Sequence, residues 1–284
     1  MFGFINIYKP KGMTSHDVIY VLRCVTKIKQ IGHTGTLDPF AEGVLPVCIG
    51  KATRLIEYLN DDKAYIGTVQ LGKSTTTYDI EGETINISDK KVTAEEIESA
   101  LNFFRGEIEQ YPPIYSAIKV KGKKLYEYAR KGEEVKIEPR KVKINRLEIL
   151  EFNNIQNKLK ILIECSKGTY IRSIANDLGE KLGTYGHLIN LERIKAGKFL
   201  KENSVNLDSI KSIEDVRNNI INPLEYLDYP KYELNNEELK LISNGRNINI
   251  SMKDGVTILI FDNKIAAIGE CRNNIFECNK VFVN

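Results

Sequence analysis

The chain has 284 residues, of which 42% are hydrophobic and 28% are charged. These proportions are typical of a folded globular protein and exclude a disordered, collagen-like or coiled-coil chain. The length is enough for one large domain, or for a large domain and a small one. The net charge of +3 is too small by itself to indicate a polyanionic partner.

Nothing in the sequence predicts secretion or membrane insertion. The longest apolar runs, such as 256–261, are far shorter than the roughly 18 residues that a spanning helix needs. The first residues lack the basic stretch and apolar segment of a signal peptide. The 5 cysteines are scattered and include no Cys-x-x-Cys pair, so we expect free thiols, no metal site and a cytoplasmic protein.

Signals near the start of the chain predict a helix followed by a long loop. Thr14 and Asp17 fit a capping box, and apolar residues then follow helical spacing, which predicts a helix over about 15–28. Glycines and prolines gather over 31–46 and favour irregular structure over most of that stretch. Beyond the loop we expect a strand at 45–49, a helix at 53–59 and a strand at 64–71.

The rest of the chain mixes helices with antiparallel strands. Thr93 and Glu96 fit a second capping box, and Gly106 stands where that helix should end. Strand-like segments at 142–152 and 158–165 flank an asparagine-rich turn and predict a hairpin. A further helix is expected from Ile171. After a linker at 222–230, we expect a helix at 234–243 and strands at 256–261, 264–269 and 275–283.

These elements lack the regular alternation of strand and helix that builds a doubly wound sheet. They indicate an α+β, or mixed α/β, fold with largely antiparallel pairing. We expect two domains, a large one at 1–229 and a small, β-rich one at 230–284.

One segment carries a concentrated positive charge. Residues 119–146 contain 11 basic and 4 acidic side chains, with Tyr126 and Tyr128 among them. Lysine and arginine neutralise phosphates, and tyrosine rings can stack on unpaired bases, so the segment suits a nucleic acid. A solvated surface hairpin with no partner has the same composition, and the composition leaves both interpretations open.

Residues 67–74, GTVQLGKS, match the letters of a phosphate-binding loop. Such a loop has to follow a strand and open a helix, because the helix N-terminus faces the phosphates. Here the residues between the glycines are themselves strand-like, and the β-branched, turn-rich TTTYDIEGE follows. We therefore do not expect an NTPase.

Asp38 lies in the glycine-rich loop GHTGTLDP, where Pro39 favours an extended backbone that can present the carboxylate. Taken alone, such an aspartate often only caps a turn. Four motifs change this interpretation: NIYKPKGMTSHDV, IGHTGTLDPFAEGVLPVCIGKATRL, KAYIGTVQLG and CSKGTYIRSIANDLGEKLG. In order and spacing, over roughly residues 4–200, the chain resembles the TruB family of bacterial tRNA pseudouridine synthases.

The resemblance implies the pseudouridine synthase fold. It implies a central, largely antiparallel sheet, a mobile thumb inserted at about 119–146, and a PUA-like RNA-binding domain at 230–284. The implied partner is tRNA, bound at its T-arm and elbow by a monomer that needs no other protein.

The implied reaction detaches uracil from uridine-55 in the T-loop of tRNA, rotates it and reattaches it through C5, without cofactor or metal. The resemblance makes Asp38 the catalytic residue. A carboxylate can attack the base or the sugar, or remove a sugar proton, and the sequence leaves these roles open. Arg172 is implied as the ionic partner of Asp38, and Tyr65 as a tyrosine that contacts the flipped base and can remove the C5 proton.

Five further residues are implied to serve the substrate. Tyr170 and Leu191 line an apolar slot around the base, and Gly35 belongs to the loop that faces it. His33 enters the T-loop where the target uridine has left the stack. Lys9, followed by Pro10, supports the catalytic loop. Without the resemblance, each of these would be an ordinary core, strand or loop residue.

The chain departs from the family at Thr76, which stands where an aspartate is usual in the motif that here reads LGKSTTTYD. This substitution removes a negative charge and makes the preference for a tRNA position less certain. The rival interpretation is an RNA-binding or RNA-folding protein without chemistry. The intact GHTGTLDP loop favours the enzyme, and a tRNA-folding role can accompany it.

Overall fold

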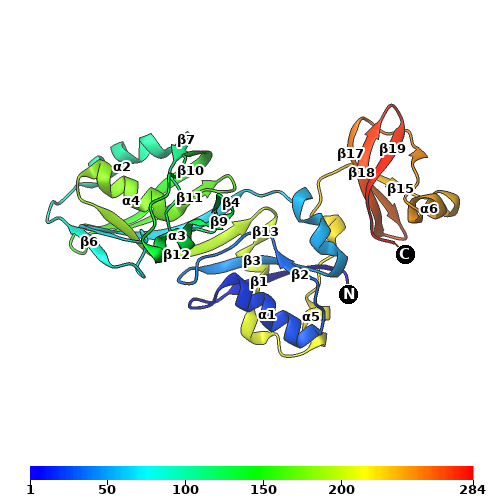
Figure 1. Cartoon of the computed structure of the whole chain (residues 1–284), viewed down its shortest axis with the longest axis horizontal. Helices are drawn as coiled ribbons and strands as arrows, with labels where there is room; N and C mark the ends of the chain where they lie inside the picture. Colours follow the sequence, from blue (N-terminus) through cyan, green and yellow to red (C-terminus); the bar gives the residue numbers. More distant parts are fainter. Residues whose placement is uncertain (284) are drawn as a thin grey trace.

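The computed structural model describes residues 1–283, and its two larger sheets lie at opposite ends of the molecule (Figure 1). The larger sheet has 10 strands, in the order β14-β1-β3-β12-β4-β11-β10-β7, with β2 beside β3 and β13 beside β12. Its strands are β1 (Gly3–Lys9), β2 (Ile31–His33), β3 (Glu42–Ile49), β4 (Lys63–Leu71), β7 (Gly106–Gln110), β10 (Arg140–Asn153), β11 (Lys158–Cys165), β12 (Gly186–Ala196), β13 (Phe199–Leu200) and β14 (Val205–Asn206).

Pairing in this sheet is antiparallel except between β1 and β14 and between β12 and β3. The predicted mixed α/β class with a largely antiparallel sheet is therefore confirmed. The predicted hairpin is formed by β10 and β11, and the strand predicted at 45–49 begins earlier, at Glu42.

The helices pack on the sheet in two groups. Near β10, α2 (Ala94–Leu101) and α4 (Ile171–Leu182) share a core with β4 and β11, in which Ile97, Leu178 and Ile163 are all fully buried. Near β1, α1 (Ser15–Thr26) and α5 (Ile213–Asn218) cover a second core around Leu45. Both predicted capping boxes are present, at Thr14 and at Thr93.

Two expectations need correction. The predicted helix at 53–59 is a 3₁₀ helix, η1 (Gly50–Tyr58), and a 3₁₀ turn, η2 (Asn102–Phe104), extends α2. The stretch at 31–46 contains β2 and the start of β3, so its irregular part is only 34–41. Short 3₁₀ segments, η3 (Lys201–Asn203), η4 (Leu207–Ser209) and η5 (Pro223–Glu225), join the later elements.

The second sheet has 5 strands in the order β15-β17-β18-β19-β16. Its elements are β15 (Lys231–Glu233), α6 (Asn236–Ser243), β16 (Ile248–Asn249), β17 (Gly255–Phe261), β18 (Lys264–Arg272) and β19 (Ile275–Val281). Apolar residues join it to the first part of the chain, because Ile258 and Ile268 share a buried cluster with Phe4 and Leu55. Arg54 Nη1 also donates to the carbonyl of Val281 at 2.9 Å.

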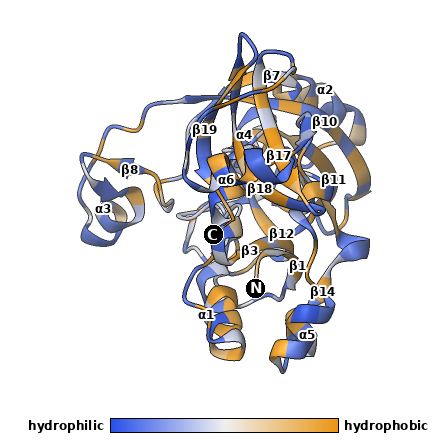
Figure 2. Cartoon of the chain, turned by 90° about the vertical axis from the view of Figure 1, so that its right-hand side faces the viewer, coloured by the Kyte–Doolittle hydropathy of each residue, from blue (hydrophilic) through white to orange (hydrophobic). Residues whose placement is uncertain are grey.

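Between β7 and β10 the chain leaves the sheet. Strands β8 (Lys119–Val120) and β9 (Lys123–Lys124) and helix α3 (Leu125–Lys131) project from the body of the molecule (Figure 2). From Arg140 onward the chain belongs to β10. The basic segment at 119–146 therefore lies partly in the projecting region, up to residue 139, and partly in the large sheet. We call residues 111–139 the thumb.

The phosphate-loop letters do not open a helix. Residues 67–71 lie in β4, and Lys73 begins β5 (Lys73–Thr75), which pairs with β6 (Thr84–Ile87). All 5 cysteines are free, as expected. No helix within residues 1–283 is long and apolar enough to cross a membrane.

Candidate active site

A cavity of about 500 Å³ lies where the 34–41 loop, β4, β12, the start of α4 and the thumb come together. Six of the eight predicted site residues line it, and two, Lys9 and His33, do not. The six are Gly35, Asp38, Tyr65, Tyr170, Arg172 and Leu191. The structure thus brings together residues from three of the four sequence motifs and Leu191, which lies beyond them.

Asp38 and Arg172 form a bidentate ion pair. Arg172 Nε lies 2.9 Å from Asp38 Oδ2, and Arg172 Nη2 donates to Asp38 Oδ1 at 3.1 Å. The Arg172 side chain is 5% exposed, whereas that of Asp38 is 31% exposed. The guanidinium is therefore buried beneath the carboxylate, and the carboxylate remains open to the cavity.

Asp79 is a second carboxylate that pairs with Arg172. No pattern in the sequence indicated this residue. Arg172 Nη1 lies 3.2 Å from Asp79 Oδ2, and Asp79 is 2% exposed. Asp79 is itself fixed, because its Oδ1 accepts from Thr77 Oγ1 at 2.5 Å and from the backbone N–H of Glu81 at 3.0 Å. A guanidinium that binds two fixed carboxylates has little freedom to rotate.

The thumb also holds Arg172. The guanidinium donates to the carbonyls of Thr77 at 3.2 Å and Tyr115 at 3.1 Å, and Tyr115 belongs to the start of the thumb. Ser173 Oγ donates to the carbonyl of Tyr111 at 2.9 Å. The first residues of the thumb are therefore attached to the first turn of α4.

The environment makes the Asp38 carboxylate more basic than an ordinary one. Burial raises the pKa of Asp38 above its usual 3.8, and the negative charge of Asp79 raises it further, while Arg172 opposes the shift. The raised pKa gives a carboxylate that is a better base or nucleophile, with Arg172 beside it to stabilise the charged form.

The loop that carries Asp38 is held by buried polar groups. Ser15 Oγ accepts from the backbone N–H of Leu37 at 2.8 Å and donates to the Leu37 carbonyl at 3.2 Å. The carbonyl of Pro39 accepts from the backbone N–H of Gly12 at 2.8 Å and from Lys9 Nζ at 3.4 Å. Loops are usually mobile, and these bonds give the aspartate a defined position.

Lys9 supports this loop from beneath it. Its side chain is fully buried, and Nζ donates to the carbonyls of Met13 at 2.6 Å and Pro10 at 2.9 Å as well as to that of Pro39. Burial lowers the pKa of Lys9 to about 8, against the attraction of Asp38. These contacts fix the Lys9 ammonium beneath the loop and outside the cavity lining.

The walls of the cavity are largely apolar. Tyr65 and Leu191 come from the adjacent strands β4 and β12 and are 7% and 4% exposed. Tyr170 is fixed by Gln110, which accepts from its backbone N–H at 2.8 Å and donates to its carbonyl at 3.0 Å. Burial raises the pKa of both tyrosines, so both are neutral phenols at neutral pH.

His33 lies outside this cavity, at the end of β2. Its Nδ1 is buried and has no hydrogen-bond partner among residues 1–283, and burial lowers its pKa. Thr76, at the position where the family usually has aspartate, is exposed, and its hydroxyl accepts from the backbone N–H of Glu83 at 3.1 Å. The sequence drew attention to Thr76, but Asp79 three residues later is the one that meets Arg172.

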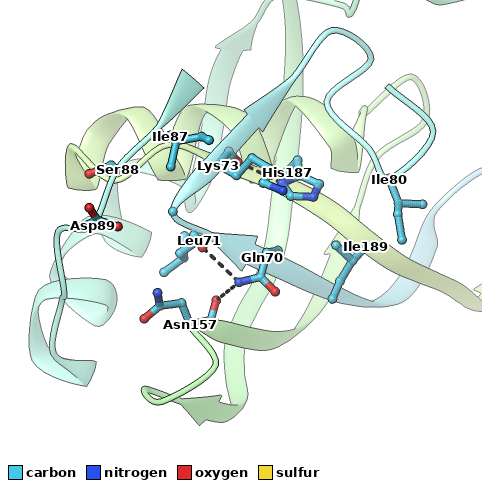
Figure 3. A pocket seen from close by; sticks show the side chains of 11 residues that line it. Gln70, Leu71, Lys73, Ile80, Ile87, Ser88, Asp89, Asn157, His187 and Ile189 are labelled. Carbon is cyan, nitrogen blue, oxygen red and sulfur yellow. Dashed lines mark hydrogen bonds between the residues drawn. The ribbon is translucent and has the colours of Figure 1, made fainter. Parts of the chain in front are cut away.

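A second hollow lies at the opposite end of β4 and β12 (Figure 3). It contains Lys73 of the phosphate-loop pattern and His187, whose Nδ1 lies 2.9 Å from the carbonyl of Lys73. None of the eight predicted site residues lines it. Lys73 stands on a strand, without the helix N-terminus that binds a phosphate in such loops.

The first cavity can therefore perform acid–base or nucleophilic chemistry on a flat, partly apolar substrate. It offers the accessible carboxylate of Asp38, the buried guanidinium of Arg172 and the neutral phenols of Tyr65 and Tyr170, and Lys63, Tyr115 and Tyr126 also line it. Within the described residues, 1–283, no group of three or more His, Cys, Asp or Glu side chains could hold a metal ion.

Comparison with known proteins assigns most of the chain. The model described as TruB family pseudouridylate synthase (N terminal domain) matches residues 23–171, and that described as tRNA pseudouridylate synthase B C-terminal domain matches residues 172–227. A protein of Streptococcus mutans named tRNA pseudouridine synthase B is 41% identical, over 99% of each chain. The protein of that name in Clostridium tetani is 44% identical, over 86% of this chain and 85% of the relative.

Solved structures share the fold. A Cbf5-Nop10-Gar1 complex matches with a TM-score of 0.73 and 25% identity, over 99% of this chain and 85% of that one. An H/ACA RNP bound to a substrate RNA containing 2′-deoxyuridine matches with a TM-score of 0.73 and 23% identity, over 100% of this chain and 86% of that one. The similarity extends through the second sheet.

Proposed function

The chain belongs to the TruB family of pseudouridylate synthases, and from this premise we propose that it converts uridine-55 in the T-loop of tRNA into pseudouridine. The observation that carries the proposal is the ion pair of Asp38 and Arg172 at a cavity of about 500 Å³. Such a space suits one extruded nucleoside, and enzymes that act on a base take it out of the stack.

The reaction is an isomerisation in which every atom of the substrate is retained. The bond between C1′ of ribose and N1 of uracil breaks, the ring rotates, and a bond forms between C1′ and C5. C5 loses its proton and N1 gains one. No electrons are gained or lost overall, so the balance requires no cofactor.

Asp38 is the group that acts on the nucleoside. Its raised pKa suits either attack on the substrate or removal of a sugar proton. Arg172 keeps the carboxylate in place, and Asp79 keeps Arg172 in place. Tyr65 faces the same cavity and is the candidate to take the proton from C5, a step that requires its phenolate form.

The other predicted residues are assigned to substrate binding and support. Tyr170 and Leu191 enclose the flipped uracil between apolar surfaces, and Gly35 lets the loop approach it. Lys9 supports the loop from beneath. His33, largely uncharged at neutral pH, fills the gap that the uridine leaves in the T-loop.

Binding of the tRNA elbow is assigned to two parts of the chain. The thumb carries exposed Lys119, Lys121 and Lys131 and closes over the T-arm. Residues 230–284 form a PUA-like RNA-binding domain after a catalytic domain at 1–229. The protein acts as a monomer in the cytoplasm, and RNA folding accompanies catalysis.

Mapping the position of pseudouridine in the product tRNA tests this proposal. Unmodified tRNA transcript is incubated with the protein, and pseudouridine is mapped by chemical labelling and mass spectrometry. We expect one pseudouridine, at position 55, and none in a transcript with cytidine there. A protein that binds tRNA but forms no pseudouridine would be the RNA-binding rival. Pseudouridine at another position would contradict the assigned site.

A further inference from the structure

Arg193 has the largest fully buried side chain in the described part of the molecule. It lies on β12, two residues after Leu191 and opposite Tyr65 of β4. Within residues 1–283, no carboxylate lies within ion-pair distance of its guanidinium, whereas Arg172 has two such partners. Burying a charge without a counter-charge is costly. The fold therefore has to satisfy this guanidinium in another way.

Backbone carbonyls of the catalytic loop satisfy it. Arg193 Nη2 donates to the carbonyl of Gly35 at 3.0 Å, and Nη1 donates to that of Thr36 at 3.4 Å. Nε donates to the carbonyl of Val44 at 2.7 Å, in β3 just beyond the far end of the same loop. One rigid fork thus ties together both ends of the segment that carries Asp38.

With these bonds, each backbone carbonyl from residue 35 to residue 39 has a hydrogen-bond partner. Those of Gly35 and Thr36 bind Arg193, that of Leu37 binds Ser15, and that of Pro39 binds Lys9. The carbonyl of Asp38 itself accepts from the backbone N–H of Ala41 at 3.1 Å. Arg193 holds the residues that come before the aspartate.

The backbone around Arg193 is built for this contact. Gly43 of β3 pairs with Arg193 in parallel register and has a φ of 114°. A Cβ at Gly43 would lie 2.2 Å from the carbonyl oxygen of Arg193. A glycine is therefore needed for β3 to come close enough for Val44 to reach the guanidinium.

Arg193 also lies beside Tyr65. Arg193 and Tyr65 are directly paired across β12 and β4, and the positive charge of Arg193 opposes the rise in the pKa of Tyr65 that burial causes. A positive charge beside a phenol makes its oxygen a better site for developing negative charge. The same guanidinium thus binds the carbonyls of the catalytic loop and lies beside the tyrosine.

We propose that Arg193 is a positioning residue for the isomerisation, which holds the Gly35–Asp38 loop in reactive geometry and places a positive charge beside Tyr65, without touching the substrate. Arg193 is absent from the cavity lining, which separates its role from that of Arg172. The inference rests on the proposed function, because the rate it affects is that of pseudouridine formation.

The test compares Arg193→Lys and Arg193→Gln with the wild type under single-turnover conditions. Lysine keeps the positive charge but loses the planar guanidinium that binds several carbonyls at once. Glutamine removes the charge as well, so no unpaired charge is left buried. Misplacement of reacting groups by about 1 Å lowers rates by roughly 100-fold. We expect losses of that order, larger for glutamine, with tRNA affinity unchanged.

The matched control is Arg105→Lys. Arg105 also holds a backbone carbonyl, donating to that of Leu147 from Nε at 3.0 Å and Nη2 at 2.8 Å, but it lies away from the cavity. Circular dichroism and filter binding establish that each variant folds and binds tRNA. We expect the control to keep the wild-type rate.

Two results would overturn the inference. One is a wild-type rate in both Arg193 variants. The other is a loss of rate that only follows a loss of folded protein or of tRNA affinity, which is a structural role alone. If the wild type itself makes no pseudouridine, the proposed function fails instead. In a Tyr65→Phe background, the further loss caused by Arg193→Gln should shrink, and strictly additive losses would exclude action through Tyr65.

Discussion

At the scale of single residues, the site depends on the contacts that fix Asp38 and Arg172. Asp79 touches only the far side of the guanidinium, at 3.2 Å. Replacing it therefore changes the freedom of Arg172 and the charge felt by Asp38, while the cavity wall stays the same. One substitution at Asp79 therefore reports the first effect as a change in rate and the second as a change in pH dependence.

Asp79→Asn should slow pseudouridine formation by roughly tenfold, which corresponds to about 1.4 kcal/mol of activation free energy. The amide still accepts a hydrogen bond but attracts Arg172 less, so the ion pair with Asp38 is less well oriented. Single-turnover rates and tRNA affinity are measured side by side. An unchanged rate would show that Asp38 and the thumb carbonyl suffice to hold Arg172.

The pH dependence follows from the raised pKa of Asp38. If the carboxylate is the active form, the rate falls as the pH drops through that pKa, at a pH above 3.8. Because Asp79 contributes to the rise, Asp79→Asn should move this acid limb to lower pH. The comparison needs single-turnover rates at constant ionic strength. Coincident limbs in the two proteins would mean that another group controls the acid side.

Sequence reasoning reached the residues that belong to local motifs. Asp38, Tyr65 and Arg172 were found through the resemblance, and the structure places all three around one cavity. Asp79 and Arg193 were not found, because their roles arise from contacts over 93 and 158 positions along the chain. No local pattern distinguishes such residues from an ordinary turn aspartate or a strand arginine.

At the scale of elements, helices with capping boxes were the best predicted, because their signals are local. Strand β3 was predicted too short, since Gly43 is typical of a loop. Its pairing with β1, β2 and β12 overrides that local preference. The 3₁₀ form of η1 has the same apolar spacing as a short α-helix over one or two turns.

The thumb is the element whose charge should matter most for RNA. Lys119→Gln with Lys131→Gln should weaken tRNA binding and reduce the slope of log affinity against log salt by roughly 0.7–0.9 for each phosphate that is no longer neutralised. Binding is measured over a salt series, with exposed Lys211→Gln, outside the thumb, as control. Equal slopes for wild type and double variant would favour a solvated hairpin that does not touch RNA.

At the scale of the whole molecule, the two larger sheets share a buried apolar interface. Ile258, Ile265 and Ile268 of the second sheet share a buried cluster with Phe4 and Leu55. Arg54 and Lys280 add hydrogen bonds across the same boundary. The sequence analysis predicted the two domains, but no sequence pattern indicated this interface, because it depends on the path of the linker at 222–230.

Ile268→Ala should therefore destabilise the whole chain. Ile268 is fully buried, and truncating such a side chain costs about 2–5 kcal/mol. Calorimetry should show one transition, shifted to lower temperature. Ile275→Ala is the control, because Ile275 is 44% exposed and should matter little. A separate early transition for the second sheet would mean that the units unfold independently.

The central claim is that Asp38 isomerises a uridine in tRNA, and release of tritium from transcript labelled at uridine C5 tests it most directly. The wild type should release the label from the T-loop uridine, because the C5 proton is lost when the new bond forms. Asp38→Asn should bind tRNA equally well and release none. Release by Asp38→Asn at the wild-type rate, or none from a folded wild type that binds tRNA, would contradict the account.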